Sequence, residues 1–173
     1  MKSPKNYRIS LGILWLSILS FLITTCNRFK DPLYVGTWQH EDKIDIGGLI
    51  LSTTRTLILT ETTYEEIYTI KRENSDFILS ILGIKGDLLV KGPAVTFSLK
   101  EIGTCVKDAS QNCTDQVVFY GTGTQYYADN IQYFTLTING NFEADENFLL
   151  LSRDLNADGD TDDIGEYIEF ERV

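Results

Sequence analysis

The chain has 173 residues, of which 43% are apolar and 23% are charged. This composition is typical of a globular protein and excludes a disordered or fibrous one. Lys and Arg number 15 against 25 Asp and Glu, so the formal net charge is −10. Nucleic-acid binding is driven by neutralisation of phosphates with basic side chains, and adsorption to an anionic bilayer surface also needs them. We therefore expect no nucleic-acid partner.

Residues 1–25 combine a basic start with a short apolar run. Lys2, Lys5 and Arg8 form the basic start. The apolar run follows at 9–23 and is interrupted only by Ser and Gly. The run covers about 15 residues, fewer than the roughly 20 that span a bilayer as a helix. The pattern is typical of a secretory signal. We expect a signal peptide at 1–25, a tether at 26–32 and one folded domain at 33–173.

The end of this run carries a cysteine in a recognisable context. Leu22-Ile23-Thr24-Thr25-Cys26 resembles the lipobox of bacterial lipoproteins, although Thr25 departs from the usual Gly, Ala or Ser. The resemblance implies cleavage before Cys26, acylation of its thiol and amino group, and anchoring in a bacterial membrane, for which we expect the outer membrane. Looser boxes of this sort are typical of spirochaetes. An ordinary cleaved signal and an uncleaved anchor are the alternatives.

The two other cysteines, Cys105 and Cys113, are separated by seven residues in a polar stretch. In an exported protein such a pair is expected to form a disulfide. Closing so small a loop contributes on the order of 2.5 kcal/mol in the chain-entropy description.

The mature chain is rich in β-branched and aromatic residues, with Gly, Asn, Asp and Ser between the runs. Asn139-Gly140 is a typical type I′ hairpin signal. Antiparallel strands joined by short turns predict an all-β fold, a single up-and-down β-barrel, because closure removes sheet edges. The strands are expected at about 33–40, 54–60, 62–71, 76–82, 87–91, 94–101, 115–121, 130–139, 147–153 and 165–173, while 44–52 is ambiguous.

The first and last of these strands carry a family resemblance. Gly36-Thr37-Trp38 resembles the G-x-W signature that begins the first strand in the calycin group, which includes the lipocalins. The resemblance implies a lipocalin-like barrel in which Trp38 fills the closed end and packs against a basic residue of the last strand. Arg172 has the same parity as the apolar Ile168 and Phe170, so it is the expected partner.

An acidic segment near the C-terminus resembles the D-x-[DN]-x-[DN]-G run of a calcium loop. Position 12 of such a loop is a bidentate Glu, whereas here it is Gly165, with Glu166 one residue later. The pattern predicts a weak calcium site at a hairpin tip, and a solvated turn made of good turn formers is the alternative. The candidate ligands at positions 1, 3, 5, 7 and 9 are Asp154, Asn156, Asp158, Asp160 and Asp162.

Catalytic signatures are missing from the sequence. His40 is the single histidine, and the chain has no G-x-S-x-G elbow, H-E-x-x-H pair or phosphate-binding glycine loop. We therefore predict no enzyme, and instead a membrane-anchored interaction or binding module at the surface or facing the periplasm. Two alternatives stay open: a carrier of a small apolar ligand inside the barrel, and a periplasmic enzyme inhibitor.

Mass spectrometry of the mature protein tests the anchor. We expect a chain that begins at Cys26 and carries acyl groups there, because the lipobox resemblance implies cleavage and acylation at this residue. A chain that still begins at Met1, or one without acyl groups, would contradict this expectation.

Overall fold

The computed structural model describes residues 32–156, 158–161, 163 and 166–173. Residues Leu33–Val173 form one compact unit, whereas the expected signal peptide at 1–25 and Cys26 lie outside the described residues. In the part of the chain that is described, no helix has the length and apolar character needed to cross a membrane.

The unit is built from nine strands that pair in antiparallel fashion throughout, so the all-β class is confirmed. Alternation of apolar and polar residues explains this, because it gives strands such as β5 and β8 one buried face and one more exposed face. The strands are β1 (Gly36–Ile46), β2 (Leu49–Leu59), β3 (Thr63–Arg72), β4 (Ile78–Lys91), β5 (Ala94–Lys107), β6 (Cys113–Gly121), β7 (Thr137–Ala144), β8 (Phe148–Arg153) and β9 (Tyr167–Arg172).

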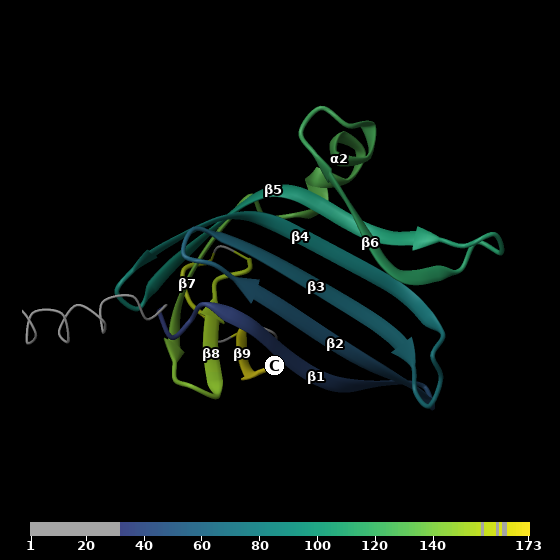
Figure 1. The fold of residues 1–173 in the computed structure, drawn as a ribbon, viewed down its shortest axis with the longest axis horizontal. Helices are drawn as coiled ribbons and strands as arrows, with labels where there is room; N and C mark the ends of the chain where they lie inside the picture. Colours follow the sequence, from purple (N-terminus) through teal and green to yellow (C-terminus); the bar gives the residue numbers. More distant parts are fainter. Residues whose placement is uncertain (1–31, 157, 162, 164–165) are drawn as a thin grey trace, which may run out of the picture. The chain divides into compact units, whose positions relative to one another are not determined.

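The strands form one sheet that closes into a ring, in the order β1-β2-β3-β4-β6-β5-β7-β8-β9, and β4 also pairs directly with β5 along most of its length. The two ends of the ring differ, because β5 pairs with β7 through Ala94–Ser98 and with β6 mainly through 101–107. The last strand β9 pairs with β1 only at Trp38 and Gln39. The long strands therefore run on past the short strands β7, β8 and β9 (Figure 1).

We call the part completed by β7, β8 and β9 the closed end. The open half is the remaining part, formed by 40–46 of β1, 49–55 of β2, 68–72 of β3, 78–84 of β4, 101–107 of β5, and β6. The ladder that joins β1 to β9 ends at Gln39, so the ring is split along the open half. Strand β5 pairs with three strands, β4, β6 and β7, which departs from a simple up-and-down order.

The main core fills the closed end. It consists of Trp38, Leu57, Leu59, Tyr64, Leu88, Val95, Phe97, Leu149, Leu151, Ile168 and Phe170. Trp38 is fully buried, and its Nε1–H donates to the Tyr34 carbonyl at 2.8 Å.

The expected partner of Trp38 lies directly beside it. The Arg172 guanidinium carbon is 4.1 Å from the centre of the Trp38 ring, and the same guanidinium donates to the backbone oxygens of Val35 and Leu33. Gly36 has φ +149°, and a Cβ there would lie 2.5 Å from Arg172 Nη1. The positive φ and the close approach of this arginine together favour glycine at this position of the G-x-W signature.

A second, smaller cluster covers the outer face of the sheet. It contains Ile78, Ile81 and Cys105, with Ile67, Cys113 and Val117 packed against it. The predicted disulfide between Cys105 and Cys113 is confirmed, and it joins β5 to β6 beside the loop 108–112 that connects them.

Two glycine positions explain one difference from the predicted strands. The segments expected at 76–82 and 87–91 form the single strand β4, because Gly83 and Gly86 continue the strand instead of turning it. A Cβ on Gly83 would lie 2.8 Å from the Phe119 ring, which packs on the outer face. The ambiguous segment 44–52 is the β1–β2 hairpin, turned by Gly47 and Gly48 with φ +62° and +90°.

Two predictions in the region 122–144 are wrong. Of the strand expected at 130–139, only 137–139 lie in β7; the helix α2 (Gln125–Asn130) and the 3₁₀ turn η2 (Ile131–Tyr133) occupy 130–133, and 134–136 are irregular. Thr124 caps α2 by accepting the Tyr127 N–H. Asn139-Gly140 lies inside β7 and makes no hairpin, because Asn139 accepts a hydrogen bond from Thr96 and Gly140 lies against the Ser152 backbone.

Candidate functional site

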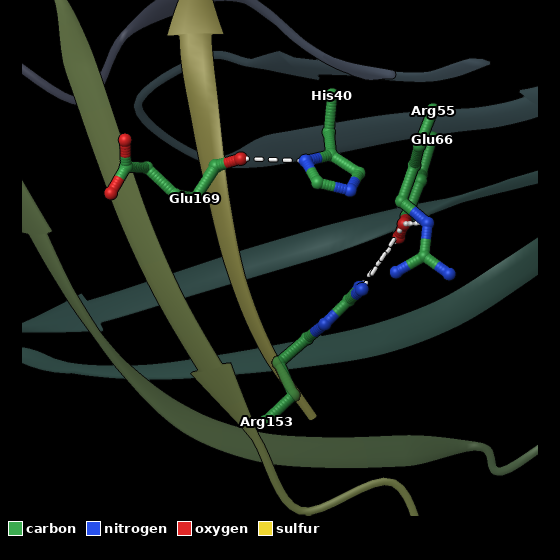
Figure 2. Close-up of polar contacts among 5 residues, drawn as sticks. All are labelled: His40, Arg55, Glu66, Arg153 and Glu169. Atoms are coloured by element: carbon green, nitrogen blue, oxygen red, sulfur yellow. Dashed lines mark hydrogen bonds and ion pairs between the residues drawn. The ribbon is translucent and has the colours of Figure 1, made fainter. Parts of the chain in front are cut away.

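Three charged side chains meet inside the ring, and we call Arg55, Glu66 and Arg153 the arginine cluster. Arg153 from β8 makes a two-pronged contact with Glu66 from β3, with Nη1–Oε2 and Nη2–Oε1 distances of 2.5 and 3.1 Å. Arg55 from β2 approaches the same carboxylate, with Nε 3.5 Å from Oε1. Figure 2 shows the two guanidinium groups converging on Glu66.

Strand register brings these residues together. Glu66 lies opposite the buried Leu57, and Arg55 lies two residues from Leu57 along β2, so both side chains face inward. Arg153 follows the buried Leu149 and Leu151 at the same period of two. The cluster therefore lies where the packed core of the closed end stops.

Burial makes this cluster expensive unless its charges are paired. Glu66 and Arg153 are 6% and 3% exposed, and removing an ion from water costs several kcal/mol. Burial raises the pKa of the Glu66 carboxyl, but the attraction of Arg153 and Arg55 outweighs it, so that this pKa lies below its ordinary value. Burial lowers the pKa of Arg55, and Glu66 offsets this only in part. Arginine nevertheless stays charged in proteins, so the cluster holds three charges at neutral pH.

The pairing within the cluster is incomplete. Two guanidinium groups share one carboxylate, which leaves one excess positive charge. Within the part of the chain that is described, the buried atoms Arg55 Nη1 and Arg153 Nε have no hydrogen-bond partner. Aromatic rings flank both arginines. The centre of the Tyr68 ring is 5.3 Å from Arg55 Cζ, and the centre of the Phe97 ring is 5.7 Å from Arg153 Cζ. The cluster can thus still accept a negatively charged group.

His40 lies beside this cluster, opposite Arg55 in the β1–β2 ladder. Its Nδ1 is 2.9 Å from the backbone oxygen of Glu169, and its ring meets the Phe170 ring edge-on at 6.0 Å. Figure 2 shows this contact reaching across from β1 to β9. The imidazole therefore bridges the two strands just after their backbone ladder ends at Gln39.

Beyond the cluster, the inner face of the open half carries several large apolar side chains that are exposed, beside the exposed charged residues Asp42 and Arg72. The registers place Ile44, Ile46, Leu49 and Leu82 on the same face as Trp38, Leu57 and Leu88. Their exposed fractions are 39%, 60%, 43% and 43%. A contiguous apolar patch, unlike single exposed apolar residues, indicates an interaction site.

The structure places four of the five predicted calcium ligands in one loop. Asp154 accepts the backbone N–H groups of Asp158 and Gly159, and Asn156 donates to Asp158. Asp160 is also in the loop, and its N–H donates to Asp158, whereas Asp162 lies outside the described residues. Among the residues that the structure describes, no three acidic, His or Cys side chains lie close enough to hold a metal ion. Calcium binding stays a prediction.

Glu166 stabilises this loop by accepting hydrogen bonds from its backbone. Its side chain is buried and accepts the backbone N–H groups of Leu155 and Asp163 at 2.7 and 3.2 Å. A carboxylate one position late for a calcium loop thus closes the loop through backbone hydrogen bonds.

Sequence reasoning missed the arginine cluster. Glu66 and Arg153 are 87 residues apart in the chain, so no local motif joins them. The sequence did contain a signal. In strands with alternating apolar and polar residues the inward positions are normally apolar, and the charged residues Arg55, Glu66 and Arg153 occupy inward positions.

Comparisons with protein-family models, curated proteins and solved structures found no match to this chain.

Replacing the carboxylate tests how strongly the cluster depends on it. Glu66→Gln leaves the buried Arg153 and the partly buried Arg55 without a counter-charge, and we expect it to lower the free energy of unfolding by about 3 kcal/mol or more. Urea unfolding of the full chain, followed by circular dichroism, measures this. Because the pKa of Glu66 is lowered by folding, its contribution is present above the ordinary value of 4.5 and is lost as the pH falls below it.

The control for that variant is Glu65→Gln. Glu65 is the chain neighbour of Glu66, points to the opposite face and pairs with Lys85 at 2.9 Å. We expect a loss of under about 1 kcal/mol, since partly exposed ion pairs contribute little. Equal losses for the two variants would contradict the assigned role of Glu66.

Calcium titration tests the acidic loop. We expect millimolar Ca²⁺ to raise the melting temperature of the wild-type chain, because it would relieve repulsion among the loop carboxylates. Asp158→Ala should abolish the rise, and Asp87→Ala on the outer face of β4 should preserve it. Melting temperatures that do not change with Ca²⁺ in any of the three proteins would rule out the site.

Proposed function

We propose that this chain is a lipid-anchored, non-catalytic binding module whose ligand enters the open half of the ring. The observation that supports this most is the contrast between the two ends of the sheet. Side chains fill the closed end around Trp38 and Phe170, whereas Ile44 and Leu82 are exposed on the inner face of the open half. Burying that face against a ligand would be favourable by about 25 cal/mol for each Å² of apolar surface.

The anchor rests on the N-terminal pattern. The basic start, the short apolar run and the lipobox-like segment ending at Cys26 favour export and acylation. An acidic domain gains little from the charge of an anionic membrane, and so a covalent lipid is the suitable means of attachment. We propose the outer membrane of a bacterium as its location.

The finer description of the fold belongs to this proposal. We propose a lipocalin-like barrel, supported by the packing of Arg172 on Trp38 and by the position of both residues in the ladder between the first and last strands. The absence of catalysis is supported by the contact of His40, which joins a backbone carbonyl and not a nucleophile.

A charge placed on the inner face tests the binding proposal. We expect a neutral alkanol carrying a photoreactive diazirine to label peptides from 40–55 and 68–84 of the full chain in phosphatidylcholine nanodiscs. Leu82→Glu should reduce this labelling about tenfold, because it places a carboxylate on the apolar inner face. Mass spectrometry of the labelled peptides measures the effect.

The matched control is Leu89→Glu. Leu89 lies on the same strand, is 53% exposed compared with 43% for Leu82, and faces outward because its neighbour Leu88 is in the core. We expect labelling to be unchanged. Labelling that is spread evenly over both faces, or equal losses for both variants, would refute the proposal.

A further inference from the structure

We propose that the arginine cluster binds the carboxylate of a small amphipathic ligand, whose apolar chain lies along the inner face of the open half. This inference deepens the proposed function and rests on it. It assigns a head-group site to Arg55 and Arg153, and a chain site to the exposed residues around Ile44 and Leu82.

The charge of the cluster indicates the sign and size of the ligand charge. Two guanidinium groups face the single carboxylate of Glu66, so one monoanion makes the buried group neutral. A ligand with two negative charges would instead leave the buried group with one excess negative charge. The arginine fork matches a planar carboxylate and can bind it through two parallel hydrogen bonds.

The unpartnered donors indicate where the carboxylate binds. Arg153 Nε and Arg55 Nη1 are both buried and lack partners within the described residues, and a buried donor without a partner costs about 1–3 kcal/mol. The Arg153 side chain is 4% exposed, whereas that of Arg55 is 23% exposed. A ligand therefore reaches the cluster from the side of Arg55, which is the side of the open half.

The route from Arg55 suits a slender apolar chain. Thr53 and Leu51 follow Arg55 on the inner side of β2, and Ile44 lies opposite Leu51. Four residues of strand cover about 13 Å, the length of a medium alkyl chain. Leu82 borders this route from β4, opposite Tyr68. Since the unpartnered atoms are themselves buried, a thin chain fits this route better than a protein segment.

One acidic side chain shares this face. Asp42 lies opposite Thr53 in the ladder, is exposed, and accepts the backbone N–H of Lys43 at 2.7 Å. The Asp42 carboxylate is exposed to solvent, so water and salt screen its charge, whereas the charge of Glu66 is buried.

Competition against the neutral alkanol probe tests the inference on the full chain in phosphatidylcholine nanodiscs. We expect octanoate to displace the probe at a concentration about tenfold or more below that of 1-octanol, and octylammonium to compete no better than 1-octanol. Octanoate should also raise the melting temperature of the chain, because a ligand that binds only the folded state stabilises it.

Two variants separate a head-group site from a structural one. Arg55→Gln should abolish the advantage of octanoate over 1-octanol without lowering the stability of the ligand-free chain, because the Glu66–Arg153 pair that remains is neutral. Lys100→Gln removes a positive charge from the outer surface, where Lys100 pairs with Asp87, and should leave the advantage intact.

The outcomes distinguish this inference from the function on which it rests. Labelling of the inner face with equal competition by octanoate and 1-octanol would overturn the carboxylate site and leave the binding module standing. No labelling of the inner face by the neutral probe would overturn both. An Arg55→Gln chain that is strongly destabilised, or that keeps the preference for octanoate, would show that Arg55 is structural and would also overturn the inference.

Discussion

The closure of the sheet at Trp38 and Arg172 is the contact on which the rest of the structure depends. The ladder between the first and last strands consists of only two residue pairs. Side-chain contacts must therefore supply much of the interaction that holds β1 against β9. Arg172 stacks on the indole and donates to backbone oxygens of the segment before β1. A cation shielded over an aromatic face gains more than an exposed one, which suits this position at the end of the core.

The short ladder between β1 and β9 leaves the inner face of the open half uncovered. The pairing of β9 with β1 ends at Gln39, and β7 pairs only with Ala94–Ser98 of β5, so β7, β8 and β9 do not continue along the open half. The inner face of the open half then continues the apolar pattern of the core without the opposing wall that would bury it. The arginine cluster stands at this boundary, between the packed end and the exposed face.

Local patterns predicted what depends on one strand at a time. Alternation predicted the inward side of β9 and therefore Arg172, and the spacing of Cys105 and Cys113 predicted the disulfide. Contacts between distant strands were beyond such patterns: Gly83 stays inside a strand because Phe119 packs on it, and Asn139 is held in β7 by Thr96. The same limit concealed the arginine cluster, since its members belong to β2, β3 and β8 and no spacing along the chain relates them.

A buried group of two arginines and one glutamate is difficult to explain by stability alone. Well-packed apolar residues in place of buried ion pairs are often neutral or stabilising, and here the excess charge and the two unpartnered donors add further cost. Proteins retain such costly groups where function needs them. The position of the cluster agrees with this reasoning, because the same residues deeper in the core would be unreachable and residues further along the open half would be hydrated. At the boundary they are dry enough to attract an anion strongly and close enough to water to receive it.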